Sequence, residues 1–97
     1  MKVEILGMTQ KKDGENWGNL KALVDVRIDD KIELFGIRIV KDIDGKLWVA
    51  MPSYVLMNQK KKSFVKVIRF PKLEDWIEIK TKILDYYLNK GEKDDGN

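Results

Sequence analysis

The fold is decided by residues 31–52, which read KIELFGIRIVKDIDGKLWVAMP. Two apolar segments, 31–41 and 47–51, flank the turn Asp42-Ile43-Asp44-Gly45, and its Asp-Gly pair suits a type I′ hairpin. Large apolar side chains fall on both faces of the first segment, and the second segment is apolar at every position. Strands of that kind are typically covered on both sides. The stretch therefore predicts an antiparallel hairpin. Its first strand is expected to be central or covered by a second layer, and its second strand to be buried on both faces.

Two more strands are expected before this hairpin. Residues 2–10 alternate with a period of two, and turn-forming residues fill 11–18. Residues 19–29 alternate more regularly, with a mostly polar face opposite an apolar one. The apolar face consists of Ala22, Val24, Val26 and Ile28. A strand with one face exposed to solvent favours an antiparallel sheet.

The segment after the hairpin is less regular up to residue 59. An apolar pattern typical of a strand resumes at 63–70, and Pro71 closes it because proline lacks the N–H group that a strand ladder needs. We therefore expect a fifth strand at 63–70.

The last predicted element is a helix at 75–90, where the apolar period changes to that of a helix. Asp75 and Glu78 resemble a capping box at its start, and Gly91 is a natural residue just past its end. The apolar arc that should pack on the sheet consists of Leu73, Trp76, Ile77, Ile83, Leu84, Tyr87 and Leu88.

These elements predict an α+β fold, in which a meander of about five antiparallel strands carries one C-terminal helix on a face. We expect residues 1–90 to form a single domain and 91–97 to form a flexible polar tail. A chain of 97 residues buries a modest core, so we expect it to dimerise through the sheet. The longest uncharged run, 47–59, is too short to cross a bilayer, and no export signal is visible, so a cytoplasmic protein without membrane contact is expected.

The composition argues against catalysis. The chain has no histidine and no cysteine, which excludes Ser–His–Asp and Cys–His sites, zinc thiolate sites and disulfides. Asp42 and Asp44 lack the further ligands of a calcium loop, so a turn is the better interpretation. Lys80 falls in the helical arc, where a lysine more often extends to its edge than acts chemically. We expect no enzyme, no cofactor and no small-molecule substrate.

The net charge of +3 is unevenly distributed. Residues 1–59 are neutral, whereas residues 60–72 carry six bases and no acid. The six bases are Lys60, Lys61, Lys62, Lys66, Arg69 and Lys72. Two interpretations stay open: a solvated segment that keeps an edge strand from aggregating, or a surface that binds a polyanion. Phe64 and Phe70 lie among these bases and could stack on nucleobases, although aromatic residues facing a helix normally belong to the core.

A short motif indicates a family. The strand Ile37-Arg38-Ile39-Val40, a turn with Asp44-Gly45, and Trp48-Val49-Ala50-Met51-Pro52-Ser53 follow one another in this order. This arrangement resembles the signature of the SpoVG family, the stage V sporulation or septation regulators, whose last motif is of the F-V-A-M-P-S type. The flanking residues are compatible with the family at the level of pattern.

The resemblance implies a small bacterial cytoplasmic protein that is not an enzyme. It implies a dimer that forms through the sheet, binds DNA and RNA, and modulates gene expression linked to sporulation and septation. Ala50, Met51, Pro52 and Ser53 would then be a structural family motif, and nucleic-acid contacts would lie between this motif and the helix. Family members typically continue with Lys-Arg, where this chain has Tyr54-Val55 and carries its lysines further on. The role of that Lys-Arg pair is therefore not carried over.

Three functions compete at this point. The first is a homodimeric nucleic-acid-binding regulator, in which the five lysines of 60–72 contact phosphates and Arg69 makes a bidentate contact. The second is a homodimeric protein-interaction module in cell division that has no specific nucleic-acid binding. The third is an enzyme, which would need a pocket that contains a lysine or carboxylate with a perturbed pKa.

Overall fold

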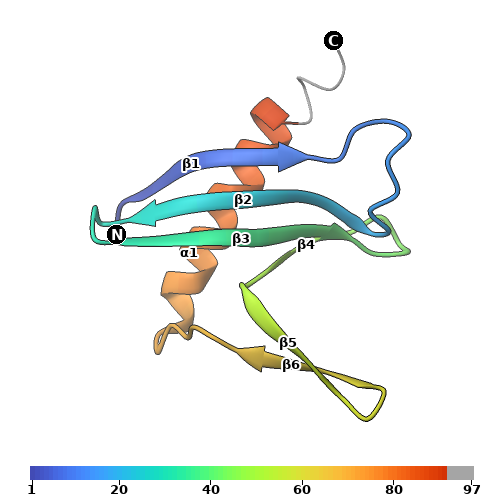
Figure 1. Cartoon of the computed structure of the whole chain (residues 1–97). Coiled ribbons are helices and arrows are strands. Elements are labelled where there is room, and N and C mark those ends of the chain that lie inside the picture. The colour runs from blue at the N-terminus through green and yellow to red at the C-terminus, as the bar shows by residue number, and fades with distance from the viewer. Residues whose placement is uncertain (92–97) are drawn as a thin grey trace.

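The computed structural model of the protein describes residues 1–91, with side chains up to residue 89. Four antiparallel strands form the main sheet in chain order, and two more form a separate hairpin (Figure 1). The main sheet contains β1 (Val3–Gln10), β2 (Leu20–Ile28), β3 (Ile32–Lys41) and β4 (Leu47–Ala50). The hairpin contains β5 (Ser53–Asn58) and β6 (Lys61–Lys66), and the helix α1 (Leu73–Tyr86) continues into a π-helical turn at Tyr87–Gly91. The predicted polar tail lies outside the described residues, apart from the backbone of Gly91.

The α+β class is confirmed, but the single five-stranded meander is wrong. Met51 and Pro52 follow β4, and Pro52 cannot donate to a strand ladder, so the chain leaves the main sheet there. The supposedly irregular residues 53–58 pair with 61–66 around a two-residue turn at Gln59 and Lys60. Both turn residues have positive φ, 48° and 70°, as a type I′ turn requires. Residues 67–70 lie beyond the hairpin and form no strand.

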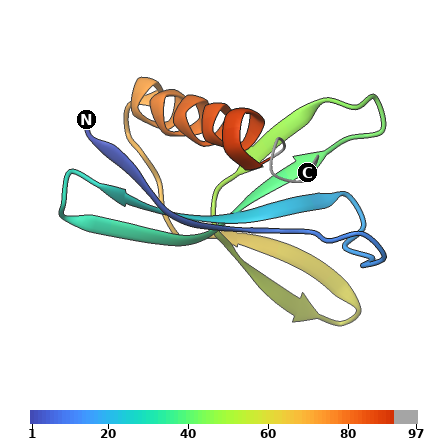
Figure 2. The same ribbon diagram turned by 90° about the horizontal axis from the view of Figure 1, so that it is seen from above.

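The core lies between the main sheet and the helix, which covers one face of the sheet (Figure 2). The regular strand β2 supplies the predicted face, and each of its four apolar residues is buried. The largest fully buried side chains are Ile37, Ile39, Ile79, Ile83, Val24 and Val26. Burial of these branched side chains from strand and helix holds the two layers together.

A glycine bulge decides which face of β3 is buried. Val24 pairs with Ile37 and Val26 pairs with Leu34, so two residues of β3, Phe35 and Gly36, lie opposite one residue of β2. Gly36 has a φ of 74°, and its N–H group donates to Asp25 Oδ1 at 3.0 Å. The extra residue shifts the alternation by one. Both neighbours of the bulge, at 34 and 37, therefore point to the core.

The expectation that β3 and β4 are covered on both faces is consequently wrong, and β4 is an edge strand of the main sheet. In β3 the bulge leaves Phe35 60% exposed, and in β4 Trp48 is 51% exposed. The Trp48 indole N–H donates to Asp42 Oδ2 at 2.9 Å, and the other oxygen of that carboxylate accepts the backbone N–H groups of Asp44 and Lys46. Within this turn Gly45 alone has positive φ, so the turn is not of type I′.

The helix begins earlier than predicted. Its N-cap is Lys72, which makes no side-chain capping bond, so the capping box built on Asp75 is wrong. The buried stripe runs through Trp76, Ile79 and Ile83, and Ile79 was missing from the predicted arc. Burial of this stripe, rather than a cap, defines the helix. Three members of the predicted arc are instead exposed, namely Leu73, Ile77 and Leu88. The chain also stays helical through Gly91, which is not the predicted residue past the helix end.

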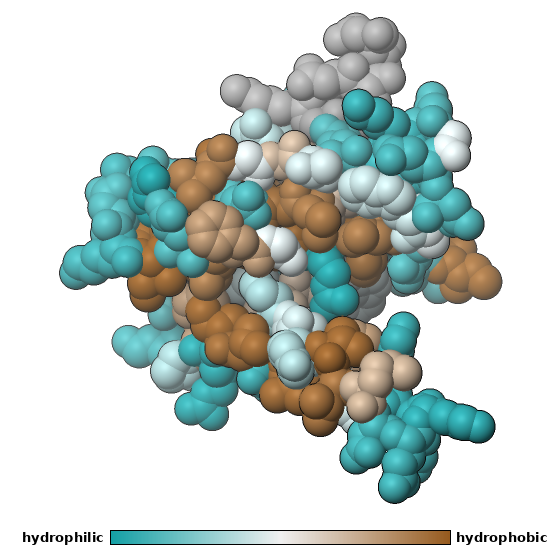
Figure 3. Space-filling model, in the orientation of Figure 1, coloured by the Kyte–Doolittle hydropathy of each residue, from teal (hydrophilic) through white to brown (hydrophobic). Residues whose placement is uncertain are grey.

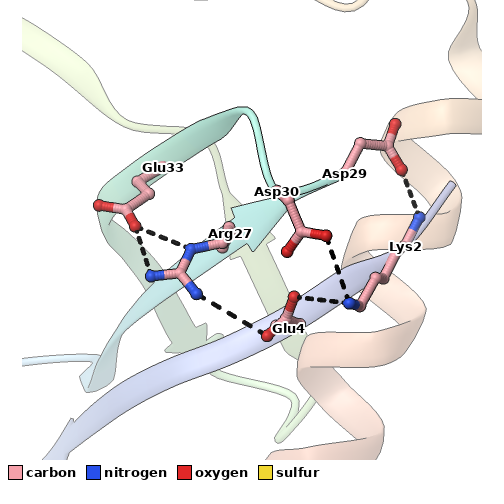
Figure 4. A network of polar contacts seen from close by, with 6 residues as sticks. All are labelled: Lys2, Glu4, Arg27, Asp29, Asp30 and Glu33. Atoms are coloured by element: carbon pink, nitrogen blue, oxygen red, sulfur yellow. Dashed lines mark hydrogen bonds and ion pairs between the residues drawn. The ribbon is translucent and has the colours of Figure 1, made fainter.

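Polar contacts tie the first strand to the β2–β3 end of the sheet (Figure 4). The Arg27 guanidinium lies 2.8 Å from Glu33 Oε2 and 3.9 Å from Glu4 Oε2, and Lys2 Nζ lies 3.3 Å from Glu4 Oε1. Hydrogen bonding to Glu4 raises the pKa of Lys2, and hydrogen bonding to Glu33 raises the pKa of Arg27. Charges at this end of the sheet are therefore compensated within the chain.

Candidate nucleic-acid interface

The six predicted bases all come from the hairpin and from the segment that joins it to the helix. Lys60 lies in the hairpin turn, three lysines lie on β6, and Arg69 and Lys72 lie between β6 and the helix. Every one of the six is exposed. Within residues 1–89 none of them forms an ion pair, which distinguishes them from Lys2 and Arg27. The surplus of positive charge therefore lies on residues 53–72, the hairpin and its link to the helix, which we call the arm. The hairpin projects from the β4 edge of the sheet (Figure 1).

The hairpin register sorts its side chains onto two faces. Ser53 pairs with Lys66, Val55 with Phe64, and Met57 with Lys62, so these six side chains share one face. We call this the Phe64 face. On it the two lysines lie on either side of the aromatic ring along β6. The other face carries Tyr54 with Val65, Leu56 with Ser63, and Asn58 with Lys61, and we call it the Leu56 face.

The two phenylalanines of the basic segment have different surroundings. Phe70 packs against the core and stacks on Trp76, with ring centroids 6.0 Å apart, as predicted for a core aromatic. Phe64 is 62% exposed, so the same expectation is wrong for it. The reason is that the hairpin leaves the sheet at Pro52, so Phe64 does not lie between the main sheet and the helix.

Apolar side chains are exposed on both faces of the hairpin. Figure 3 shows a hydrophobic surface along the hairpin and hydrophilic side chains at its tip. The large apolar side chains exposed here are Tyr54, Val55, Leu56, Met57, Phe64 and Val65. A two-stranded hairpin alone is marginally stable in water, and contiguous apolar patches of this kind mark interaction sites. The hairpin therefore combines a charged tip at residues 60–62 with exposed apolar side chains along β5 and β6, which we call the apolar shaft.

A pocket of about 350 Å³ lies where the hairpin leaves the body of the protein. Its lining comes from β3, the β4–β5 link, both hairpin strands and the helix, namely Arg38, Met51, Pro52, Ser53, Phe64, Lys66 and Trp76. The Arg38 Nη2 atom donates to Ser53 Oγ at 3.1 Å, and its guanidinium carbon lies 5.9 Å from the Phe64 ring centroid. Two cations and two aromatic rings thus line one cavity, which contains no carboxylate.

Arg38 was not among the predicted site residues, because it lies far from 60–72 in the sequence. A signal for it exists. The β3–β4 turn sets the register that places Arg38 opposite Ala50, at the start of the family motif. Of the motif, Met51, Pro52 and Ser53 line the pocket, while Ala50 ends β4. Pairing the residues on either side of the predicted turn would therefore have placed Arg38 beside Ala50 of the motif.

The remaining candidates are not drawn into this site. Lys80 is half-buried on the helix, and Asp42 organises its own turn. Within residues 1–91 the structure holds no group of three or more carboxylates arranged to bind a metal ion. No helix in the same range is long and apolar enough to cross a bilayer.

Comparison with known proteins supplies the family. The SpoVG family model matches residues 1–89, which is almost the whole chain. The chain belongs to the SpoVG family. It is 36% identical over 56 residues to a protein of Fusobacterium nucleatum subsp. nucleatum that bears the provisional name septation protein SpoVG. The match covers 58% of this chain and 59% of that relative, so it spans about three fifths of each. No solved structure matches the chain significantly.

Proposed function

We propose that this SpoVG-family protein is a nucleic-acid-binding regulator, acting on DNA, RNA or both in bacterial gene regulation linked to septation and sporulation. Family membership and the name of the Fusobacterium relative support the link to septation. The observation that carries nucleic-acid binding is the projecting arm, whose six exposed bases have no acidic partner within residues 1–89. Unpaired cations on a protruding strand suit the phosphate backbone. In this proposal the protein is a cytoplasmic binding protein and not an enzyme.

The test reverses the charge of the hairpin tip. In the variant Lys60→Glu, Lys61→Glu, Lys62→Glu, binding to duplex DNA, single-stranded DNA and structured RNA should be lost while the circular dichroism spectrum is retained. The matched control carries the same change of net charge on other elements, at Lys12, Lys31 and Lys82, all of which are exposed. That control should bind with an affinity reduced only by long-range charge. Unchanged affinity in the tip variant would overturn the assignment.

A homodimer is the second part of the proposal, and it is supported by the apolar side chains of the hairpin. We assign the Leu56 face to a second copy of the chain, because Tyr54, Leu56 and Val65 are otherwise exposed to water. A Leu56→Lys variant should then sediment as a monomer at micromolar concentration, where the wild type sediments as a dimer. A wild-type protein that is monomeric under these conditions would contradict the assignment.

The same apolar shaft favours a second candidate function, a homodimeric protein-interaction module in cell division without specific nucleic-acid binding. In that case the lysines only keep the arm soluble. This candidate predicts a protein partner whose capture does not respond to reversal of the tip charges. It also predicts affinity for nucleic acid no greater than that of other proteins with a charge of +3.

A further inference from the structure

The pocket at the base of the hairpin has chemistry that a phosphate-binding surface does not need. Phosphate contacts require only exposed cations, which the hairpin tip already supplies. The pocket adds two aromatic rings, Phe64 and Trp76, and the apolar Met51. Trp76 is itself fixed, because it is buried and stacked on Phe70. The lining therefore includes one buried and fixed aromatic ring, Trp76, and one exposed ring, Phe64.

The cations of the pocket are positioned to receive an anion. Arg38 is oriented by its bond to Ser53 Oγ, and within residues 1–89 no carboxylate lies within ion-pair distance of it or of Lys66. A guanidinium has five N–H donors, so most of those on Arg38 stay open for a ligand. Planar donors of this kind bind phosphate in a bidentate manner. The pocket therefore combines an apolar lining with two cations, Arg38 and Lys66, that are available to bind a phosphate.

We infer that the pocket holds one unpaired nucleobase of a single strand, with the adjoining phosphate on Arg38 and Lys66. This inference rests on the proposed function and specifies its substrate. The volume of about 350 Å³ is at the lower end of the range for small-molecule sites, which suits a single flat base. The Phe64 face continues outward to Lys62, so the strand would follow β6 toward the tip. A base inside a duplex is stacked and cannot enter such a pocket, so the site selects single strands and loops.

The experiment replaces the exposed ring and leaves every charge in place. Affinities of the full chain are measured for a short oligodeoxyadenylate, for the duplex of that sequence, and for deoxyadenosine monophosphate. Phe64→Leu should weaken single-strand binding by roughly tenfold, as expected for the loss of one stacked base, and leave duplex binding unchanged. Phe64→Tyr keeps the ring and should restore wild-type affinity. Phe35→Leu removes an exposed aromatic ring from β3, outside the hairpin and the pocket, and should have no effect.

The possible outcomes separate this inference from the proposed function. Wild-type binding that weakens with salt, together with no difference between Phe64→Leu and Phe35→Leu, would overturn the base pocket and leave the regulator intact. No binding by the wild-type protein to any of the three probes would overturn both. Monophosphate that binds as tightly as the oligonucleotide would show a site for free nucleotides and would also overturn the inference. A change of sedimentation in Phe64→Leu, with affinity unchanged, would assign the pocket to a second copy of the chain.

Discussion

The bulge at Gly36 sets the faces of β3, and its replacement tests that reasoning. Gly36 has a φ of 74°, and a Cβ atom added there would meet no heavy atom within 4 Å. The N–H group that bonds to Asp25 is retained in an alanine variant. Gly36→Ala therefore measures the free-energy cost of positive φ alone, without a steric clash or a lost hydrogen bond. A non-glycine residue in the left-handed region costs about 1–2 kcal/mol, and the smaller entropy of the unfolded alanine chain offsets part of this.

We expect Gly36→Ala to lose about 1 kcal/mol of unfolding free energy, which corresponds to a fall in Tm of about 4–8 °C. Thermal unfolding at one fixed protein concentration measures it, because dimerisation would make Tm depend on concentration. Gly36→Asn should lose less, since asparagine tolerates positive φ. Gly7→Ala is the matched control, because Gly7 also has open space but no positive φ. Equal Tm values for Gly36→Ala and Gly7→Ala would refute the reasoning.

Three further predictions concern the core and the turns. Ile79→Ala, at a fully buried site, should cost about 2–5 kcal/mol of unfolding free energy in urea denaturation. The Trp48 indole bond and the Lys46 N–H group lower the pKa of Asp42 below its ordinary value of 3.8, so the stability from this carboxylate is present above that pH and is lost below it. Acid titration of the Trp48 indole N–H signal by NMR should show this step, and Asp42→Asn should remove it. Gln59→Asn suits a turn residue with a φ of 48° and should slow amide hydrogen exchange across β5 and β6.

Regular patterns in the sequence predicted the parts of the fold that are regular. The alternation over 19–29 identified the buried face of β2, because between Ala22 and Ile28 that strand contains no extra residue of its own. The buried face of β3 could not be predicted in the same way. Its alternation changes phase at Gly36, and a glycine in a strand does not reveal whether it forms a bulge. The hairpin turn was missed because Gln59 and Lys60 are not typical residues for positive φ.

The sequence predicted the basic residues of the candidate site but not its pocket. The charge count located the basic arm, since charge is additive along a sequence. The pocket depends on tertiary proximity, because it joins Arg38 from the main sheet to Phe64 of the hairpin and Trp76 of the helix. The two phenylalanines show the same limit. Their strand-like contexts are similar, and only the break at Pro52 leaves one exposed while the other packs in the core.

The central claim is that the hairpin tip contacts phosphates, and the dependence of affinity on salt measures this directly. If about five phosphates are neutralised per protomer, the logarithm of the association constant should fall with the logarithm of salt concentration at a slope of roughly −4 to −5. Replacing Lys60, Lys61 and Lys62 by glutamine removes three of these contacts, which should bring the slope to about −2. A slope that is the same in the wild type and in this variant would contradict the account.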